Sequence, residues 1–171
     1  MSNIAQILNL LSVVSLSLFS GAFLFIAVVI IGSWQAVEPE VFLSWMSDHF
    51  YRFPALMVPL NMIALLLTIA SFGTVWKSRP NSRISLGISA VCIFVCTITY
   101  PIYFAGANAE FLNRSIELSQ IKDAIHTWEI WHWVRTGLSI VALTFASWDL
   151  LFTMNRGDSS LFAADKPTSI I

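Results

Sequence analysis

The feature that most constrains this chain is the length of its uncharged stretches. No Asp, Glu, Lys or Arg occurs in residues 1–37. Three further apolar runs cover residues 54–76, 84–104 and 130–154, and only the last contains a charged residue or a histidine. Each run is at least as long as the ~20 residues with which a helix crosses a hydrocarbon core. We therefore predict an all-α integral membrane protein, a single-domain four-helix bundle with helices over residues 5–33, 54–76, 84–104 and 127–154.

Composition supports this class and excludes others. Of the 171 residues 57% are hydrophobic and 11% are charged, whereas soluble domains carry about 25% charged residues. The net charge of −1 gives no electrostatic basis for a nucleic-acid partner. The expected partners are the lipid bilayer and a lipophilic small molecule, and a homo-oligomer or a larger membrane complex stays open.

The first apolar run could instead be a secretory signal. It lacks a positively charged start and ends in Ile-Gly-Ser-Trp, which is no small-residue cleavage site. It is also longer than the ~7–15-residue apolar core of a signal peptide. We therefore expect a helix that is retained in the protein.

The charges between the apolar runs predict an orientation. Lys77, Arg79 and Arg83 follow the second run with no acid among them, whereas the other two connections carry mainly Glu and Asp. Loops rich in Lys and Arg stay in the cytoplasm. We therefore predict a multi-pass protein with the 77–83 loop and both termini in the cytoplasm.

Two other segments are too polar to span. In residues 38–52 the apolar side chains recur at helical spacing, and acids stand near the start, where the helix dipole favours them. We expect an additional interfacial helix there, between the first two spanning helices. Residues 156–171 form a polar tail that we expect to be disordered.

Polar residues inside the spans need partners. Ser12, Ser15, Ser17 and Ser20 of the first span indicate close packing with cross-helix hydrogen bonds. Asn61 in the second span needs a partner at membrane depth. We expect Asp149, near the end of the last span, to pair with Arg156 or to face water.

The stretch from His126 to Arg135 begins the last span and contains the densest group of side chains that could act in catalysis or binding. It contains two imidazoles, a carboxylate, a guanidinium and three indoles, and Glu129, His132 and Arg135 follow one another at i, i+3 spacing on one side of a helix. Ionisable groups at this depth are costly and usually face a partner, a cavity or a substrate. We therefore place the candidate site here.

Several roles are open to these groups. Arg135 could extend toward the headgroups, pair with Glu129, or hold an anionic substrate oxygen. His132 could be a general base, a metal ligand or a packing residue. A metal site would use His126, Glu129, His132 and His49, a nitrogen and oxygen set suited to zinc, iron or copper.

One pattern in this region resembles a known family. Asn113-Arg114, a spacer, and then Trp128-x-x-x-His132-x-x-Arg135-Thr136 resembles the anthrone-oxygenase-like family of small four-helix membrane proteins, most of them known only as a domain of unknown function. The chain length and the stretch from Ser15 to Gly21 are similar too. His126 and His49 have no place in that pattern, and they favour a metal site.

The resemblance implies an activity and roles for residues. Characterised fungal members are similar to oxygenases that convert a polyketide anthrone to an anthraquinone without a conventional cofactor. His132 would be the catalytic base, Arg135 would stabilise the oxyanion, and Asn113 would orient the substrate. The candidate substrate-binding residues are Asn61, Arg52, Trp128, Trp131 and Tyr100. Under this hypothesis the protein is an oxidoreductase acting on an aromatic or quinone-type molecule.

A rival hypothesis is a non-enzymatic membrane subunit or binding protein that holds a metal, haem, quinone or partner helix. A transporter ranks lower, because charge at the ends of the spans leaves no polar path across the midplane. The sequence leaves the cofactor open between none and a transition metal.

Overall fold

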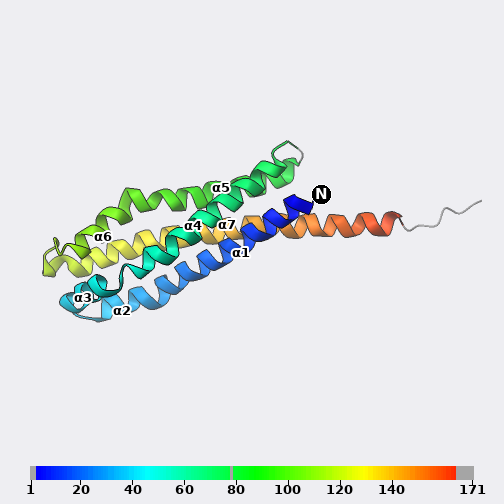
Figure 1. Cartoon of the computed structure of the whole chain (residues 1–171). Coiled ribbons are helices and arrows are strands. Elements are labelled where there is room, and N and C mark those ends of the chain that lie inside the picture. The colour runs from blue at the N-terminus through cyan, green and yellow to red at the C-terminus, as the bar shows by residue number, and fades with distance from the viewer. Residues whose placement is uncertain (1–2, 78, 165–171) are drawn as a thin grey trace, which may run out of the picture.

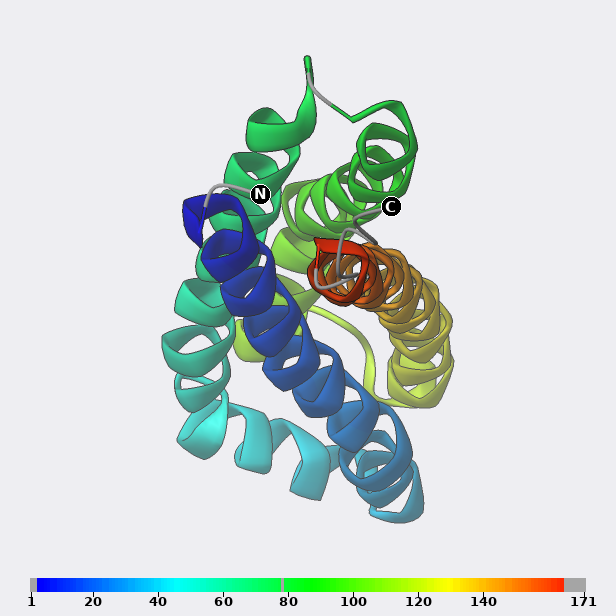
Figure 2. The same cartoon turned by 90° about the vertical axis from the view of Figure 1, so that its right-hand side faces the viewer.

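The computed structural model describes residues 3–77 and 79–164, and the side chains of residues 4–77 and 79–153. It confirms the predicted class: the described chain is helical, and four of its helices are long and apolar enough to cross a membrane. These candidate spans are Ile4–Ala36, Arg52–Val75, Pro80–Leu112 and Leu118–Thr153. They lie side by side in an elongated bundle (Figure 1), seen from one end in Figure 2.

The first span comprises α1 (Asn3–Phe25), a π-helical turn η1 (Ile26–Ile30) and α2 (Ile31–Ala36). Helix α3 (Pro39–His49) then crosses the end of the bundle within the segment that we expected to be helical, and it begins with a proline, whose missing N–H costs nothing in a first turn. Helix α4 (Arg52–Val75) returns along α1. Its Pro59 is accommodated inside the helix.

The third span is longer than its apolar run. Helix α5 (Pro80–Thr99) passes into the π-helical turn η2 (Tyr100–Phe104) and then into α6 (Ala105–Leu112). The predicted spans end at residue 104 and resume at 127, but only residues 113–120 separate α6 from the last helix, and these include the short 3-10 turn η3 (Leu118–Gln120). The extension forms because Phe111 is buried against Phe42 of α3, with ring centroids 5.0 Å apart.

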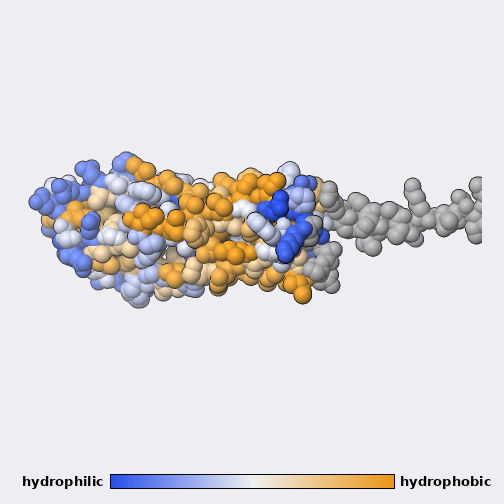
Figure 3. Space-filling model, turned by 90° about the horizontal axis from the view of Figure 1, so that it is seen from above, coloured by the Kyte–Doolittle hydropathy of each residue, from blue (hydrophilic) through white to orange (hydrophobic). Residues whose placement is uncertain are grey.

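The last helix, α7 (Ile121–Ala164), runs the length of the bundle and packs on α1 and α5. It continues through residues 156–164, so this part of the polar tail is helical where we expected disorder, and residues 165–171 lie outside the described residues. Figure 3 shows apolar residues around the middle of the molecule and hydrophilic residues toward its two ends, as expected for a chain that crosses a bilayer.

Two buried clusters fill the bundle. One lies toward the α4–α5 connection and contains small side chains such as Ala64, Ala142 and Ala146 beside Leu16 and Leu86. The other lies toward α3 and α6 and is rich in aromatic rings: Trp34, Phe42, Phe104, Phe111 and Trp128. The predicted partner for Asn61 is confirmed, because Thr97 Oγ1 donates to its Oδ1 at 3.1 Å.

Candidate binding cavity around Arg135

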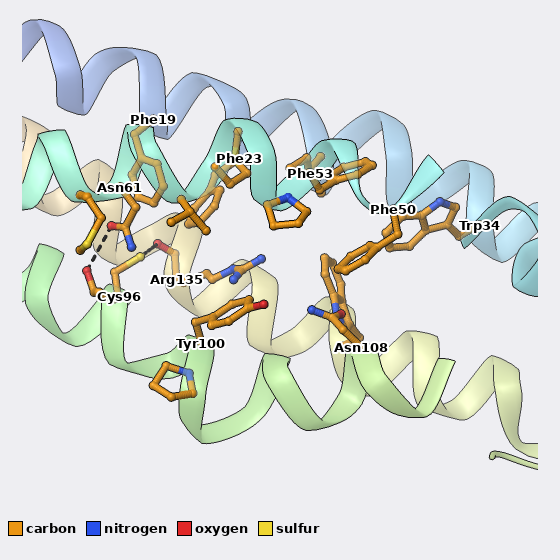
Figure 4. A pocket seen from close by; sticks show the side chains of 18 residues that line it. Phe19, Phe23, Trp34, Phe50, Phe53, Asn61, Cys96, Tyr100, Asn108 and Arg135 are labelled. Carbon is orange, nitrogen blue, oxygen red and sulfur yellow. Dashed lines mark hydrogen bonds between the residues drawn. The ribbon is translucent and has the colours of Figure 1, made fainter. Parts of the chain in front are cut away.

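A cavity of about 280 Å³ lies where the two clusters meet. Its wall is mostly aromatic and aliphatic, with a few polar groups, as in many small-molecule sites. Four residues predicted for the site line it: Asn61, Tyr100, Trp128 and Arg135. Figure 4 shows the Arg135 side chain among the rings of Phe23 and Tyr100, with Asn61 and Cys96 on one side and Asn108 on the other.

Arg135 reaches this position because α7 carries it one turn after His132. Its guanidinium carbon lies 3.5 Å from the ring centroid of Phe104 and 4.6 Å from that of Phe23. Aromatic faces attract a cation and replace part of its lost hydration. The ring of Trp128 is a third neighbour, at 5.6 Å. The guanidinium is thus enclosed by π-systems inside the bundle.

No carboxylate among the described side chains neutralises this guanidinium. Among the side chains that the structure describes, the one ion pair joins His126 and Glu129 at 3.5 Å, and Glu129 also accepts from Gln35 Nε2 at 2.5 Å. Glu129 therefore contacts residues at the rim rather than Arg135. Of the three roles predicted for Arg135, this placement favours the one in which the cation awaits an anionic ligand.

His132 contacts the guanidinium on the side away from the cavity. Arg135 donates to His132 Nδ1 from Nε at 3.2 Å and from Nη2 at 3.1 Å. An arginine has no acceptor, so Nδ1 must carry its lone pair. The other ring nitrogen, Nε2, lies 2.9 Å from the carbonyl oxygen of Phe23, which can only accept. His132 is therefore a neutral imidazole with its proton on Nε2, as assigned from these partners.

This assignment bears on the roles predicted for His132. Its side chain is 0% exposed and does not line the cavity. Both nitrogens are occupied, so neither is free to take a substrate proton or to bind a metal in this arrangement. The Trp128 ring stacks on the imidazole at 5.0 Å and 12°. In this geometry His132 supports the guanidinium of Arg135 and does not face the cavity, and its role as the catalytic base stays a prediction from the family resemblance.

The cavity holds two amides, one of which the sequence did not indicate. Asn108 of α6 is 6% exposed and accepts from Trp128 Nε1 at 2.9 Å, so its oxygen is used and its Nδ2 makes no hydrogen bond within the described chain. Asn61 likewise uses its oxygen on Thr97. Asn108 would have been a candidate had the third helix been extended through residues 105–112.

The structure does not bring Asn113 to the cavity. It is exposed after the end of α6, where its N–H donates to the Ala109 carbonyl at 2.9 Å. The next residue, Arg114, has a φ of 52° and donates to Ser44 Oγ at 3.3 Å. The Asn-Arg pair thus ends α6 and ties it to α3, and the amide that α6 contributes to the cavity is Asn108.

Two predicted substrate-binding residues also lie elsewhere. Trp131 stacks on Tyr103 at 5.1 Å, outside the cavity. Arg52 faces a neighbouring groove beside Phe25 and donates to the hydroxyl of Tyr51 at 3.1 Å. Neither contributes to the wall around Arg135.

The four predicted metal ligands are not gathered. His49 stacks on Trp45 at 5.3 Å, His132 is buried behind Arg135, and His126 is 67% exposed beside Glu129. Within the described part of the chain, no three His, Cys, Asp or Glu side chains lie close enough together to hold a metal ion.

Comparison with known proteins adds no relative: no protein-family model, no curated protein and no solved structure matches this chain.

Proposed function

We propose that the cavity binds a lipophilic aromatic molecule through an ionised oxygen, which Arg135 holds. The observation that carries this proposal is a guanidinium that lines an aromatic cavity inside the bundle and pairs with no carboxylate among the described side chains. A cation in such a place is costly unless something anionic joins it. A phenolate or enolate brings that charge while its rings pack on the aromatic wall.

The remaining polar groups suit such a ligand. A guanidinium carries five N–H donors, and His132 receives two of those of Arg135. The others can donate to the ligand oxygen as charge-assisted bonds. Asn61 Nδ2 and Asn108 Nδ2 are further donors in the wall, suited to a second oxygen on the rings.

The resemblance to anthrone oxygenases suggests the reaction. The net conversion of an anthrone CH₂ to a carbonyl consumes one O₂ and releases one water. The guanidinium favours the enolate, so the acidic proton passes to a water molecule that enters with the ligand and is returned when the peroxide forms, and the carbanion carbon forms a C–O bond to O₂. Protonation gives a hydroperoxide, and loss of water from it leaves the quinone carbonyl. In this scheme Arg135 stabilises the oxyanion and His132 keeps the guanidinium in place.

Purified protein in nanodiscs with 1,8-dihydroxyanthrone tests both binding and turnover. Loss of a charge-assisted hydrogen bond costs about 1.5–3 kcal/mol, so Arg135→Gln should weaken binding roughly 10- to 100-fold. Arg83→Gln is the matched control, because Arg83 also contacts an aromatic ring, that of Trp76, but lies far from the cavity. Equal affinity of wild type and Arg135→Gln would refute the proposal.

A second candidate is a binding protein without catalysis, which holds the same ligand or a quinone. The occupied nitrogens of His132 favour it, since the described cavity wall then offers no base. The same nanodisc experiment separates the two functions: an oxygenase consumes one O₂ per quinone formed, and a binding protein consumes none above the rate of Arg135→Gln.

The orientation is part of this proposal. Lys77, Arg79 and Arg83 support a cytoplasmic α4–α5 connection, with α3 on the opposite surface as an interfacial helix. The cavity then lies in the outer half of the membrane. A reporter enzyme active only outside the cytoplasm should be active when inserted after Asn113 and inactive after Lys77, and the reverse pattern would overturn the orientation.

A further inference from the structure

The cavity around Arg135 has an opening on the side of the bundle. Val58 and Met62 of α4 and Tyr100 of η2 line the cavity, yet they are 49%, 38% and 40% exposed. Pro101, beside Tyr100, is also both exposed and part of the lining. Residues that meet the cavity and the outside together mark its mouth. That mouth lies between α4 and η2.

The surface around the mouth is apolar. On α4 it is flanked by Leu66, one turn after Met62, and on η2 by Ile102, which are 64% and 69% exposed. These residues belong to the second and third candidate spans. An exposed apolar surface on such helices faces lipid hydrocarbon. The mouth therefore opens onto acyl chains.

The end of the cavity toward α3 is closed by rings. Trp34 is 4% exposed and meets Trp45 and Trp128 edge to face, at 5.4 and 5.3 Å. Phe53 fills the gap beside them, at 6.3 Å from Trp34 and 5.8 Å from Trp45. These rings separate Arg135 from the polar connections at that end. Entry from water there would require several packed rings to move.

The helix geometry explains why the mouth exists. Helix α5 packs on α4, but the third span changes to a π-helical turn at Tyr100, and Pro101 has no N–H to donate within it. Figure 1 shows α4 and the third span diverging toward α3 and α6. At the level of η2 the third span therefore no longer packs directly against α4, and side chains of both border the mouth of the cavity.

We propose that the cavity exchanges its ligand with the bilayer through this lateral opening between α4 and η2. This proposal rests on the proposed function and specifies the ligand further. The ligand is an aromatic acid or phenol that partitions into the membrane. A water-soluble aromatic acid of similar charge does not reach Arg135. Met62 and Tyr100 are then the residues that a ligand passes on entry.

A lipophilic aromatic photolabel, 3-trifluoromethyl-3-phenyldiazirine, tests the opening without any assumption about the natural ligand. It is dissolved in nanodiscs containing the full chain, photolysed, and the labelled residues are mapped by mass spectrometry. Phe23 and Trp128 report the cavity, because they line it and are only 3% and 4% exposed. Val141, 40% exposed on α7, reports direct contact with lipid.

We expect wild type to be labelled at Phe23 and Trp128 as well as at Val141. Met62→Trp places a large ring in the mouth and should lower cavity labelling about tenfold, as closure of an access path does. Leu66→Trp is the matched control one turn away on the same face: it is 64% exposed and does not line the cavity, so cavity labelling should persist. Val58→Trp is a second blocking variant should Met62→Trp fail to fold.

Two results would overturn the opening: label on Val141 but none on Phe23 or Trp128 in wild type, or equal cavity labelling in the blocking variants and Leu66→Trp. Competition separates this inference from the proposed function. If 1,8-dihydroxyanthrone displaces the photolabel from the cavity, both stand. If the photolabel enters but the anthrone does not compete, the opening stands and the proposed ligand is wrong.

Discussion

The two halves of the bundle solve the problem of packing membrane helices differently. In the half near the α4–α5 connection, small side chains meet: Ala142 and Ala146 are 0% exposed, and Ser89 Oγ donates to the Ala142 carbonyl at 2.7 Å. In the half near α3 and α6, aromatic rings meet edge to face around a cavity of about 280 Å³. Small residues let backbones approach closely and bond across helices. Large rings in contact at their edges leave space, and that space contains Arg135.

Each half also contains an ionisable side chain inside the bundle, Asp149 in one and Arg135 in the other. The two side chains differ in the groups that they contact. Asp149, 3% exposed, accepts from Asn9 Nδ2 at 2.9 Å and also hydrogen-bonds Ser82. Our expectation that it would face water is wrong, and the side chain of Arg156 lies outside the described residues. Arg135 instead has a neutral imidazole and aromatic faces. The carboxylate of Asp149 accepts hydrogen bonds from its neighbours, whereas the guanidinium of Arg135 keeps N–H donors that a ligand can bind.

The largest effect should come from enlarging a side chain in the close-packed half. Ala142→Phe forces α7 away from α5, and overpacking of this kind costs about 3 kcal/mol. Val58→Phe is the control in the cavity half, where the side chain can extend into the mouth at a cost of about 0.5 kcal/mol or less. Thermal unfolding in detergent measures both. Equal destabilisation would mean that the two halves are packed alike.

Asn9→Leu tests the buried aspartate. It removes a hydrogen bond to a charged group and should destabilise the protein by about 2 kcal/mol. Adding Asp149→Leu removes the partner as well and should recover much of that loss, since both buried polar groups are then gone. Asn61→Leu, which breaks only a neutral bond with Thr97, should cost about 1 kcal/mol. No recovery in the double variant would argue against a structural role for the pair.

Substitutions of His132 distinguish a role in positioning Arg135 from a role as the catalytic base. His132→Gln keeps one acceptor for Arg135 and one donor for the Phe23 carbonyl, so anthrone affinity and turnover should stay within about threefold of wild type. His132→Phe keeps the ring but loses both bonds, and affinity should fall about tenfold, or 1.4 kcal/mol. The measurements are binding and single-turnover rates in nanodiscs. Loss of turnover with unchanged affinity in His132→Gln would restore the role of catalytic base.

The fold was largely predictable because bilayer thickness imposes a length on each uncharged run. The spans follow from that length. The cross-helix bonding predicted for the serines of α1 is confirmed for Ser12, which bonds Thr68 at 2.8 Å, but Ser15 and Ser17 donate to carbonyls of their own helix, and Ser17 is exposed. The extension of the third span into α6 was not predictable from its Ala-Gly-Ala-Asn sequence, because burial of Phe111 against α3 stabilises it.

The site was predictable in part. The cost of an ionisable side chain at membrane depth predicted a site at Arg135. One cavity is indeed lined by Arg135 and three other predicted residues, Trp128, Asn61 and Tyr100. Spacing along α7 could not reveal that His132 meets the carbonyl of Phe23, 109 residues away in sequence. Nor could it distinguish Asn108 from Asn113, because that choice depends on how far a helix continues.

The smallest effect is expected at the rim of the cavity half, where His126 and Glu129 lie near the α3 end. Their contact is 3.5 Å long, His126 is 67% exposed, and exposed ion pairs contribute about 0–1 kcal/mol. His126→Ala should therefore change the unfolding temperature and anthrone affinity little, with or without added chelator. This variant also tests the metal hypothesis, because His126 and Glu129 were two of its four ligands. Elemental analysis should give the same zinc, iron and copper content for wild type and His126→Ala. Stoichiometric metal that the substitution removes would mean that the rim rearranges to gather ligands that are separate in this structure.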